Sequence, residues 1–120
     1  MLKKRIDSFK FAFKGIFELI KTQTNARIHL CTAFFVIIAA WYFQINSTEW
    51  CLSIFAITAV IAAEAFNTAL EFLTDLVSPD YHILAGKTKD AAAAGVLITA
   101  IGAAIVGLII FLPKFLLILT

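Results

Sequence analysis

Charged residues are scarce in this sequence, and proline and cysteine are scarcer still. Of 120 residues, 15% are charged, two are proline and two are cysteine, whereas 62% are hydrophobic. Soluble domains are roughly 45–50% apolar, so this composition excludes an ordinary soluble domain and indicates an integral membrane protein. Cys31 and Cys51 have no further thiol at ligand spacing. We therefore expect them to act as small hydrophobic residues rather than as disulfide or metal ligands.

Three apolar segments can cross a membrane, and all belong to one domain spanning residues 1–120. They cover residues 28–43, 50–76 and 91–113, and the last contains no charged residue. A crossing needs about 20 residues, so the first span is short, and Arg27 is expected to snorkel at its end. The polar connection 44–49 is short, which predicts that the first two spans form an antiparallel hairpin.

The distribution of basic residues predicts the orientation. Seven precede the first span: Lys3, Lys4, Arg5, Lys10, Lys14, Lys21 and Arg27. Two, Lys87 and Lys89, lie between the second and third spans, and only Lys114 follows the third. Basic residues collect on the cytoplasmic side, so we expect a multi-pass membrane protein with a cytoplasmic N-terminus. The charged first 21 residues lack the apolar core of a cleavable signal peptide.

Residues 4–22 predict a separate amphipathic helix. The apolar face of this helix consists of Ile6, Phe9, Phe13, Ile16 and Ile20. The charged face consists of Asp7, Lys10, Lys14, Glu18 and Lys21. Such a helix lies along a membrane surface. It can serve as an anchor, as a wall over a site at the interface, or as both. Residues 22–29 are expected to link it to the first span, with His29 as an interfacial or capping residue.

Four polar residues interrupt the second span: Glu64, Asn67, Glu71 and Asp75, called here the polar stripe. Their spacings of 3, 7 and 11 from Glu64 put them on one side of a helix. A carboxylate at membrane depth costs roughly 2.5–3.5 kcal/mol, so the polar stripe must face protein, water or a cation. Three interpretations follow: an ion or proton relay, chemistry on a lipid, or a structural polar seam.

Phosphoryl transfer fits the residues around the polar stripe. Carboxylate oxygens suit Mg²⁺, and Lys89 and Asp90 follow just across the next loop. Such a site works by positioning and charge neutralisation, with one base to accept the proton of the nucleophile. The run Gly86-Lys87-Thr88 is not a P-loop, because the required earlier glycine is Tyr81 and an apolar helix replaces the preceding strand.

The same stretch resembles the prokaryotic diacylglycerol kinase family, which includes undecaprenol kinases. Residues 64–75 match the pattern E-x-x-N-[ST]-A-[IL]-E-x-x-x-D, and Lys89-Asp90 begins an alanine-rich run that is also typical of it. The resemblance implies a membrane-embedded homotrimer of all-α protomers, each with a surface helix and three transmembrane helices. It also implies MgATP-dependent phosphorylation of a lipid alcohol at composite sites facing the cytoplasm.

The resemblance also implies roles for individual residues. Glu64 corresponds to the catalytic base, and Glu64 and Asn67 would contact the lipid substrate. Glu71 and position 23 correspond to metal ligands, but the usual glutamate at position 23 is Gln23 here, which removes a charge. The expected ATP and phosphate contacts are Lys14, Gly15, Asn67, Asp75, Lys89 and Asp90.

The acceptor lipid is predicted only from two short segments. Residues 25–29 and 107–114 are similar to the undecaprenol kinase branch, whereas the diacylglycerol branch tends to have an acidic residue at the position of His29. Undecaprenol is therefore favoured over diacylglycerol. The alternative from a different class remains a small ion- or proton-conducting membrane protein.

Overall fold

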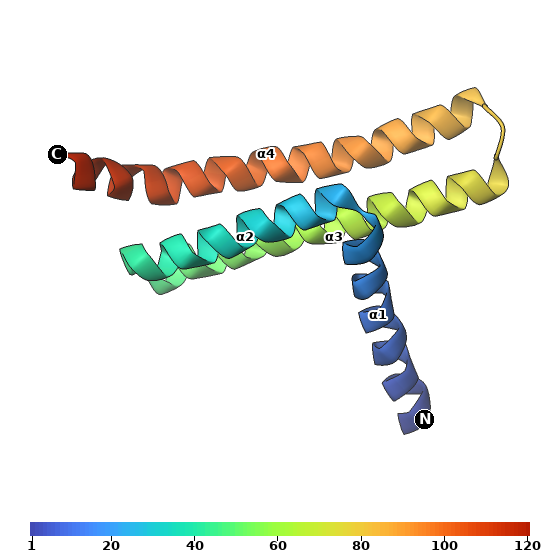
Figure 1. Ribbon diagram of the computed structural model, residues 1–120, viewed down its shortest axis with the longest axis horizontal. Coiled ribbons are helices and arrows are strands. Elements are labelled where there is room, and N and C mark those ends of the chain that lie inside the picture. Colours follow the sequence, from blue (N-terminus) through green and yellow to red (C-terminus); the bar gives the residue numbers. More distant parts are fainter.

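The protein consists of four α-helices and contains no strand. The computed structural model describes residues 1–120, and Figure 1 shows three long helices side by side with a fourth projecting from them. The helices are α1 (Leu2–Thr22), α2 (Thr24–Phe43), α3 (Ser47–Val77) and α4 (Ile83–Leu119). The last three are long and apolar enough to span a membrane. The predicted all-α membrane fold with an N-terminal surface helix is confirmed.

The three long helices expose most of their large apolar side chains. Only 12 of 120 residues are buried, while Phe55 is 77% exposed and Ile98 is 68% exposed. A soluble protein could not present such a surface to water, but lipid tails solvate it without cost. The packing that exists is mainly that of α3 against α4 and, to a lesser extent, against α2.

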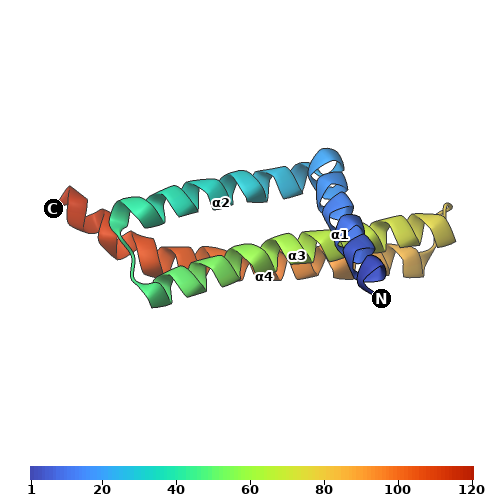
Figure 2. The same cartoon turned by 90° about the horizontal axis from the view of Figure 1, so that it is seen from below.

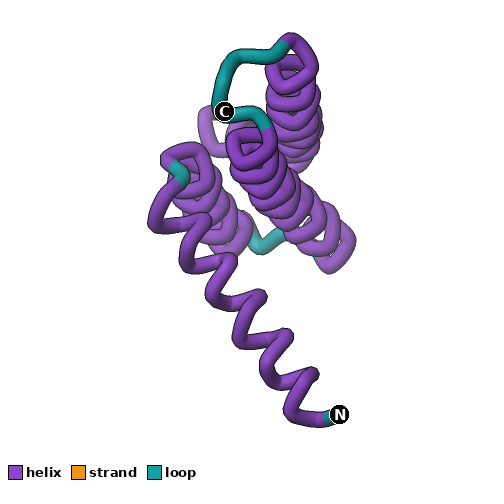
Figure 3. The backbone as a smooth tube through the Cα atoms, turned by 90° about the vertical axis from the view of Figure 1, so that its right-hand side faces the viewer, coloured by secondary structure: helices purple, strands orange, loops and turns teal.

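Helix α1 extends away from the bundle, as the end-on view in Figure 3 shows. Phe9 and Phe13 on its apolar face are 68% and 69% exposed within the protomer. Lysines follow the opposite face. An amphipathic helix with an uncovered apolar face lies in the plane of the headgroups, which accounts for its angle to the spans.

Two connections are shorter than the sequence predicts. The expected link over residues 22–29 shrinks to the single residue Gln23, whose extended backbone separates α1 from α2. Helix α4 begins at Ile83, so the loop after α3 covers only residues 78–82. The His82 side chain accepts a hydrogen bond from the backbone N–H of Leu84 and caps α4. Continuing a helix satisfies backbone groups internally, which favours short connections near a membrane.

The other end of the bundle is held by a capped turn. Asn46 accepts a hydrogen bond from the backbone of Glu49 at 2.9 Å, and the Glu49 carboxylate accepts one from the backbone of Asn46 at 3.2 Å. Glu49 also forms a 2.9 Å ion pair with Lys114 of α4. Beside this turn, Ile45 packs with Ala40 and Ile110 in the one buried apolar cluster. These contacts join all three spans at the end remote from the N-terminus.

Removing the N-cap should destabilise the protein without affecting its chemistry. Replacing an N-cap asparagine by alanine costs about 1 kcal/mol. Asn46→Ala should therefore lower the free energy of unfolding by about that amount in an SDS titration of the detergent-solubilised protein. Ser47→Ala, in the same turn but with no side-chain hydrogen bond, is the control. Equal stability of the two variants would contradict the capping role.

Candidate functional site

The polar stripe lies on the C-terminal half of α3, the helix that packs against both α2 and α4. Its four side chains differ in burial. Glu64 and Asn67 are buried, Glu71 is partly buried, and Asp75 is exposed. The stripe therefore runs from the interior of the bundle out to the surface beside the α3–α4 loop.

Glu64 is the largest fully buried side chain of the protein, with 2% exposure. Its Oε1 lies 3.6 Å from Nε2 of His29 on α2 and has no hydrogen-bond partner. Small residues allow α2 to approach closely, since Ala26 and Ala33 are both buried on this helix. A buried carboxylate with an unpartnered oxygen is costly, so its retention is typical of a functional group.

Further unpartnered polar atoms lie next to Glu64. Asn67 donates its amide to Oε1 of Glu71 at 3.3 Å, but its own carbonyl oxygen is buried without a partner. The hydroxyls of Thr68 and Ser53 are also buried without a hydrogen-bond partner. Three of the four such residues thus fall within residues 64–68. This segment offers unused acceptors and hydroxyls to a polar ligand.

The surface end of the stripe is joined to α4. Lys89 donates a 2.5 Å hydrogen bond to Asp75, and both side chains are well exposed. This contact sets the start of α4 beside the last carboxylate of α3. Asp90, the next residue, is exposed and forms no ion pair or side-chain hydrogen bond within the protomer.

The predicted residues near α1 are not joined to the stripe by hydrogen bonds. Lys14 is exposed and forms no ion pair. Gln23 is partly buried at the α1–α2 junction and donates to the Thr22 hydroxyl at 3.3 Å. Gly15 faces a cavity, described next, that also reaches α3.

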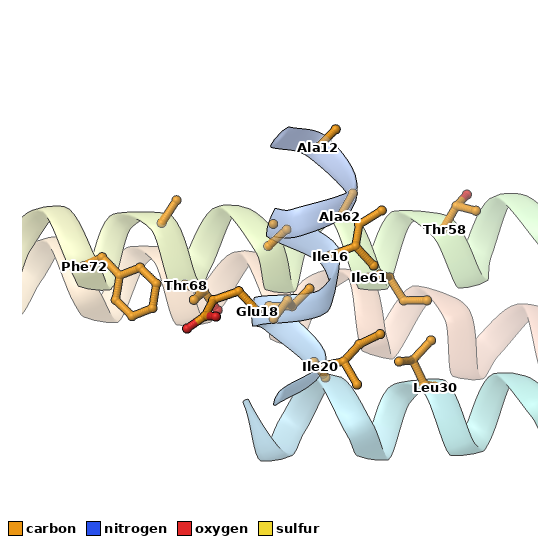
Figure 4. A pocket seen from close by; sticks show the side chains of 15 residues that line it. Ala12, Ile16, Glu18, Ile20, Leu30, Thr58, Ile61, Ala62, Thr68 and Phe72 are labelled. Carbon is orange, nitrogen blue, oxygen red and sulfur yellow. The ribbon is translucent and has the colours of Figure 1, made fainter. Parts of the chain in front are cut away.

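A cavity of about 550 Å³ is lined by residues of α1, α2 and α3 (Figure 4). Its lining is mostly apolar, and Gly15 and Glu18 contribute from α1. Thr68 also lines it from α3, and Figure 4 shows Glu18 projecting toward this part of α3. Ile61 and Ala65, on either side of Glu64 in the chain, also line it. An apolar cavity with a few polar groups suits a ligand with a hydrocarbon chain and a polar end.

The donor set is compatible with Mg²⁺ bound together with phosphates. No group of three or more His, Cys, Asp or Glu side chains gathers at metal-binding distance in the protomer. Mg²⁺ rarely needs one, because it is usually held by one or two carboxylates together with substrate phosphates and water. The partly buried carboxylate of Glu71 supplies hard oxygen ligands, and Gln23 can add a carbonyl oxygen.

Sequence reasoning undervalued His29 and missed Ser53 and Thr68. His29 was expected to be an interfacial or capping residue. It is partly buried, and its Nε2 lies 3.6 Å from the Glu64 carboxylate. Ser53 precedes Glu64 by 11 residues, the same spacing that separates Glu64 from Asp75, so the helical period could have placed it on the stripe's side. Thr68 has no such signal, because threonine is common in apolar helices.

Comparison with known proteins identifies the family. The profile described as prokaryotic diacylglycerol kinase matches residues 10–111. The chain belongs to this family. The undecaprenol kinase of Bacillus subtilis is 36% identical over 113 residues, covering 94% of this chain and 92% of that protein. A diacylglycerol kinase of Synechocystis is 41% identical over 112 residues, covering 91% of this chain but 63% of that protein. The diacylglycerol kinase of Escherichia coli is 34% identical over 80 residues, or 67% of this chain and 65% of that one.

Family membership confirms that the protein is an enzyme, an integral-membrane lipid kinase. The buried polar groups around Glu64 therefore belong to a kinase, and the ion- or proton-relay interpretation is set aside.

Proposed function

We propose that this lipid kinase transfers the γ-phosphate of ATP to the hydroxyl of undecaprenol at the cytoplasmic face of the bacterial cytoplasmic membrane. The observation that carries the proposal is Glu64, a fully buried carboxylate with an unpartnered oxygen, flanked in the chain by residues that line an apolar cavity. The relative that aligns with nearly the whole of both chains is an undecaprenol kinase, which supports this acceptor over diacylglycerol.

In the proposed reaction Glu64 acts as the general base. The lipid hydroxyl attacks the γ-phosphorus of ATP, forming the new O–P bond while the bond to the β-phosphate oxygen breaks and ADP leaves. Glu64 accepts the hydroxyl proton, and Asn67, one turn away, would contact the lipid head. The cavity between α1 and α3 would hold the adjoining hydrocarbon chain. Mg²⁺, when bound through Glu71 and Gln23, would neutralise phosphate charge.

The phosphates would lie at the surface end of the stripe. Lys89 is held there by Asp75, which orients its ammonium group beside α3. Phosphate oxygens would compete with Asp75 for this donor. Lys14, Gly15, Asn67 and Asp90 are the remaining proposed contacts for ATP.

A homotrimer with composite active sites accounts for what one protomer leaves open. Lys14 and Asp90 have no ion-pair partner within the protomer. Added Cβ atoms at Gly95, Gly102 and Gly107 would meet no neighbouring atom within 4 Å, so these glycines serve no close packing inside the protomer. Small residues on transmembrane helices allow close approach of other helices, and family resemblance favours a trimer.

The function is tested by lipid phosphorylation in mixed micelles. Purified protein with radiolabelled ATP and Mg²⁺ should label undecaprenol more efficiently than diacylglycerol, judged by kcat/KM for the two lipids side by side. Glu64→Gln should lower kcat by about 10²–10⁴-fold with little change in the KM for ATP, because it removes the base and keeps the shape. Near-normal turnover of Glu64→Gln would exclude Glu64 as the base, and preferential labelling of diacylglycerol would reverse the acceptor assignment.

Gln23 provides a test of the proposed metal site. A carboxylate binds Mg²⁺ more strongly than an amide, so Gln23→Glu should lower the Mg²⁺ concentration that gives half-maximal activity. Glu71→Gln should raise it, and the two changes should be non-additive because they act on one ion. Thr22→Ser, at the neighbouring position, is the control. An unchanged Mg²⁺ titration for Gln23→Glu would remove Gln23 from the metal site and leave the kinase assignment intact.

The trimer is tested by native mass spectrometry and by a substitution on α4 that would disturb helix packing. Native mass spectrometry in mild detergent should show three copies, and Gly102→Leu on the exposed side of α4 should weaken the assembly and the activity together. Leu108→Ile, an exposed substitution that keeps side-chain volume, is the control. Fully active monomers would exclude composite sites.

A further inference from the structure

His29 is the one ionisable side chain that contacts Glu64. It lies near the start of α2, and its side chain is 23% exposed. Besides Glu64 it borders a second cavity, of about 220 Å³, enclosed by α2, α3 and α4. Neither lysine nor arginine forms an ion pair with Glu64, and the nearby Asn67 donates its amide to Glu71. The imidazole is thus the side chain placed to donate an N–H to the buried oxygen.

We propose that His29 is a positioning residue for Glu64, an inference that rests on the proposed role of Glu64 as base. The Nε2–H of His29 would donate to Oε1 of Glu64 and hold the carboxylate in one rotamer. The other carboxylate oxygen, Oε2, would then remain to accept the proton of the lipid hydroxyl. The histidine itself neither binds substrate nor takes the transferred proton.

The distance fits a contact that closes on substrate binding. At 3.6 Å the two atoms are too far apart for a hydrogen bond, and an approach of about 0.5 Å would bring them within range. Catalytic hydrogen bonds are often long in substrate-free structures and tighten in the complex. Bringing a hydroxyl to Glu64 excludes the last water from the carboxylate, which strengthens its attraction for the remaining donor.

A purely structural role for His29 predicts a different effect of substitutions. If the imidazole only filled space between α2 and α3, a shape-similar side chain without a donor would replace it, and catalysis would follow stability. If it positions Glu64, a donor at the place of Nε2 is what matters. Glutamine keeps an N–H donor at about that reach, whereas leucine and alanine do not.

The test compares His29→Ala, His29→Leu and His29→Gln with wild type. We expect Ala and Leu to lower kcat by about 10–100-fold with the KM for ATP unchanged, the range seen when a partner that orients a functional group is lost. Gln should recover most of the activity. Thr32→Val is the matched control, because Thr32 borders the same cavity one turn deeper and its hydroxyl bonds only its own helix. Melting temperatures of all variants separate folding from catalysis.

Two further measurements make the result independent of stability. In a Glu64→Gln background, His29→Ala should cause no further loss of kcat, because the carboxylate to be positioned is gone. The chain has only two histidines, so ¹⁵N NMR of labelled His resolves both. Glu64→Gln should shift the His29 ring signals and leave those of His82 in place.

Three results would overturn the proposal: His29→Leu with kcat within twofold of wild type, losses that add in the double variant, or His29 signals unmoved by Glu64→Gln. Any of these would leave the lipid kinase reaction standing. Wild-type protein that phosphorylates neither lipid would instead remove the role of Glu64 as base, and that of His29 with it.

Discussion

The burial of one carboxylate governs the arrangement of this protein. Glu64 lies within an apolar helix, where lipid cannot solvate it, so α2 must cover it. Coverage needs a close approach, which Ala26 and Ala33 allow, and a polar partner, which His29 provides at 3.6 Å. Oxygens of Glu64, Asn67 and Thr68 nevertheless remain buried without a hydrogen-bond partner, which is uncommon in folded proteins.

The membrane supplies the rest of the stabilisation in place of a core. With 12 buried residues, the protomer has one small apolar cluster, formed by Ala40, Ile45 and Ile110. Hydrophobic burial between helices gains little where the surroundings are already apolar, so specific contacts carry the packing. Figure 2 shows that the α2–α3 and α3–α4 connections lie at opposite ends of the bundle. The Glu49–Lys114 ion pair lies near the first connection and the Asp75–Lys89 ion pair near the second.

Hydropathy and the helical period were sufficient to predict the fold and the shared side of the polar stripe on α3, because both are local properties of the sequence. The lengths of the connections were not predictable in this way. The polar residues 22–29 and 83–90 read as loops, yet all of them except Gln23 are helical. Tertiary contacts decide this, as when His82 caps α4. The pairing of His29 with Glu64 joins residues 35 positions apart, and no pattern within one helix contains it.

Because a single residue joins α1 to α2, a small change of backbone angle at that residue would move the far end of α1 by several ångströms. Gln23 is the only non-helical residue between the two helices, and Leu19 is the only buried residue of α1. Lys14 lies nine residues back along α1, about 13 Å from that pivot at ~1.5 Å per residue. A rotation of ten degrees at Gln23 would therefore carry it by about 2 Å, most of a hydrogen-bond length. A shift of α1 along the membrane surface would therefore change the distance between Lys14 and α3 while leaving the three spans in place.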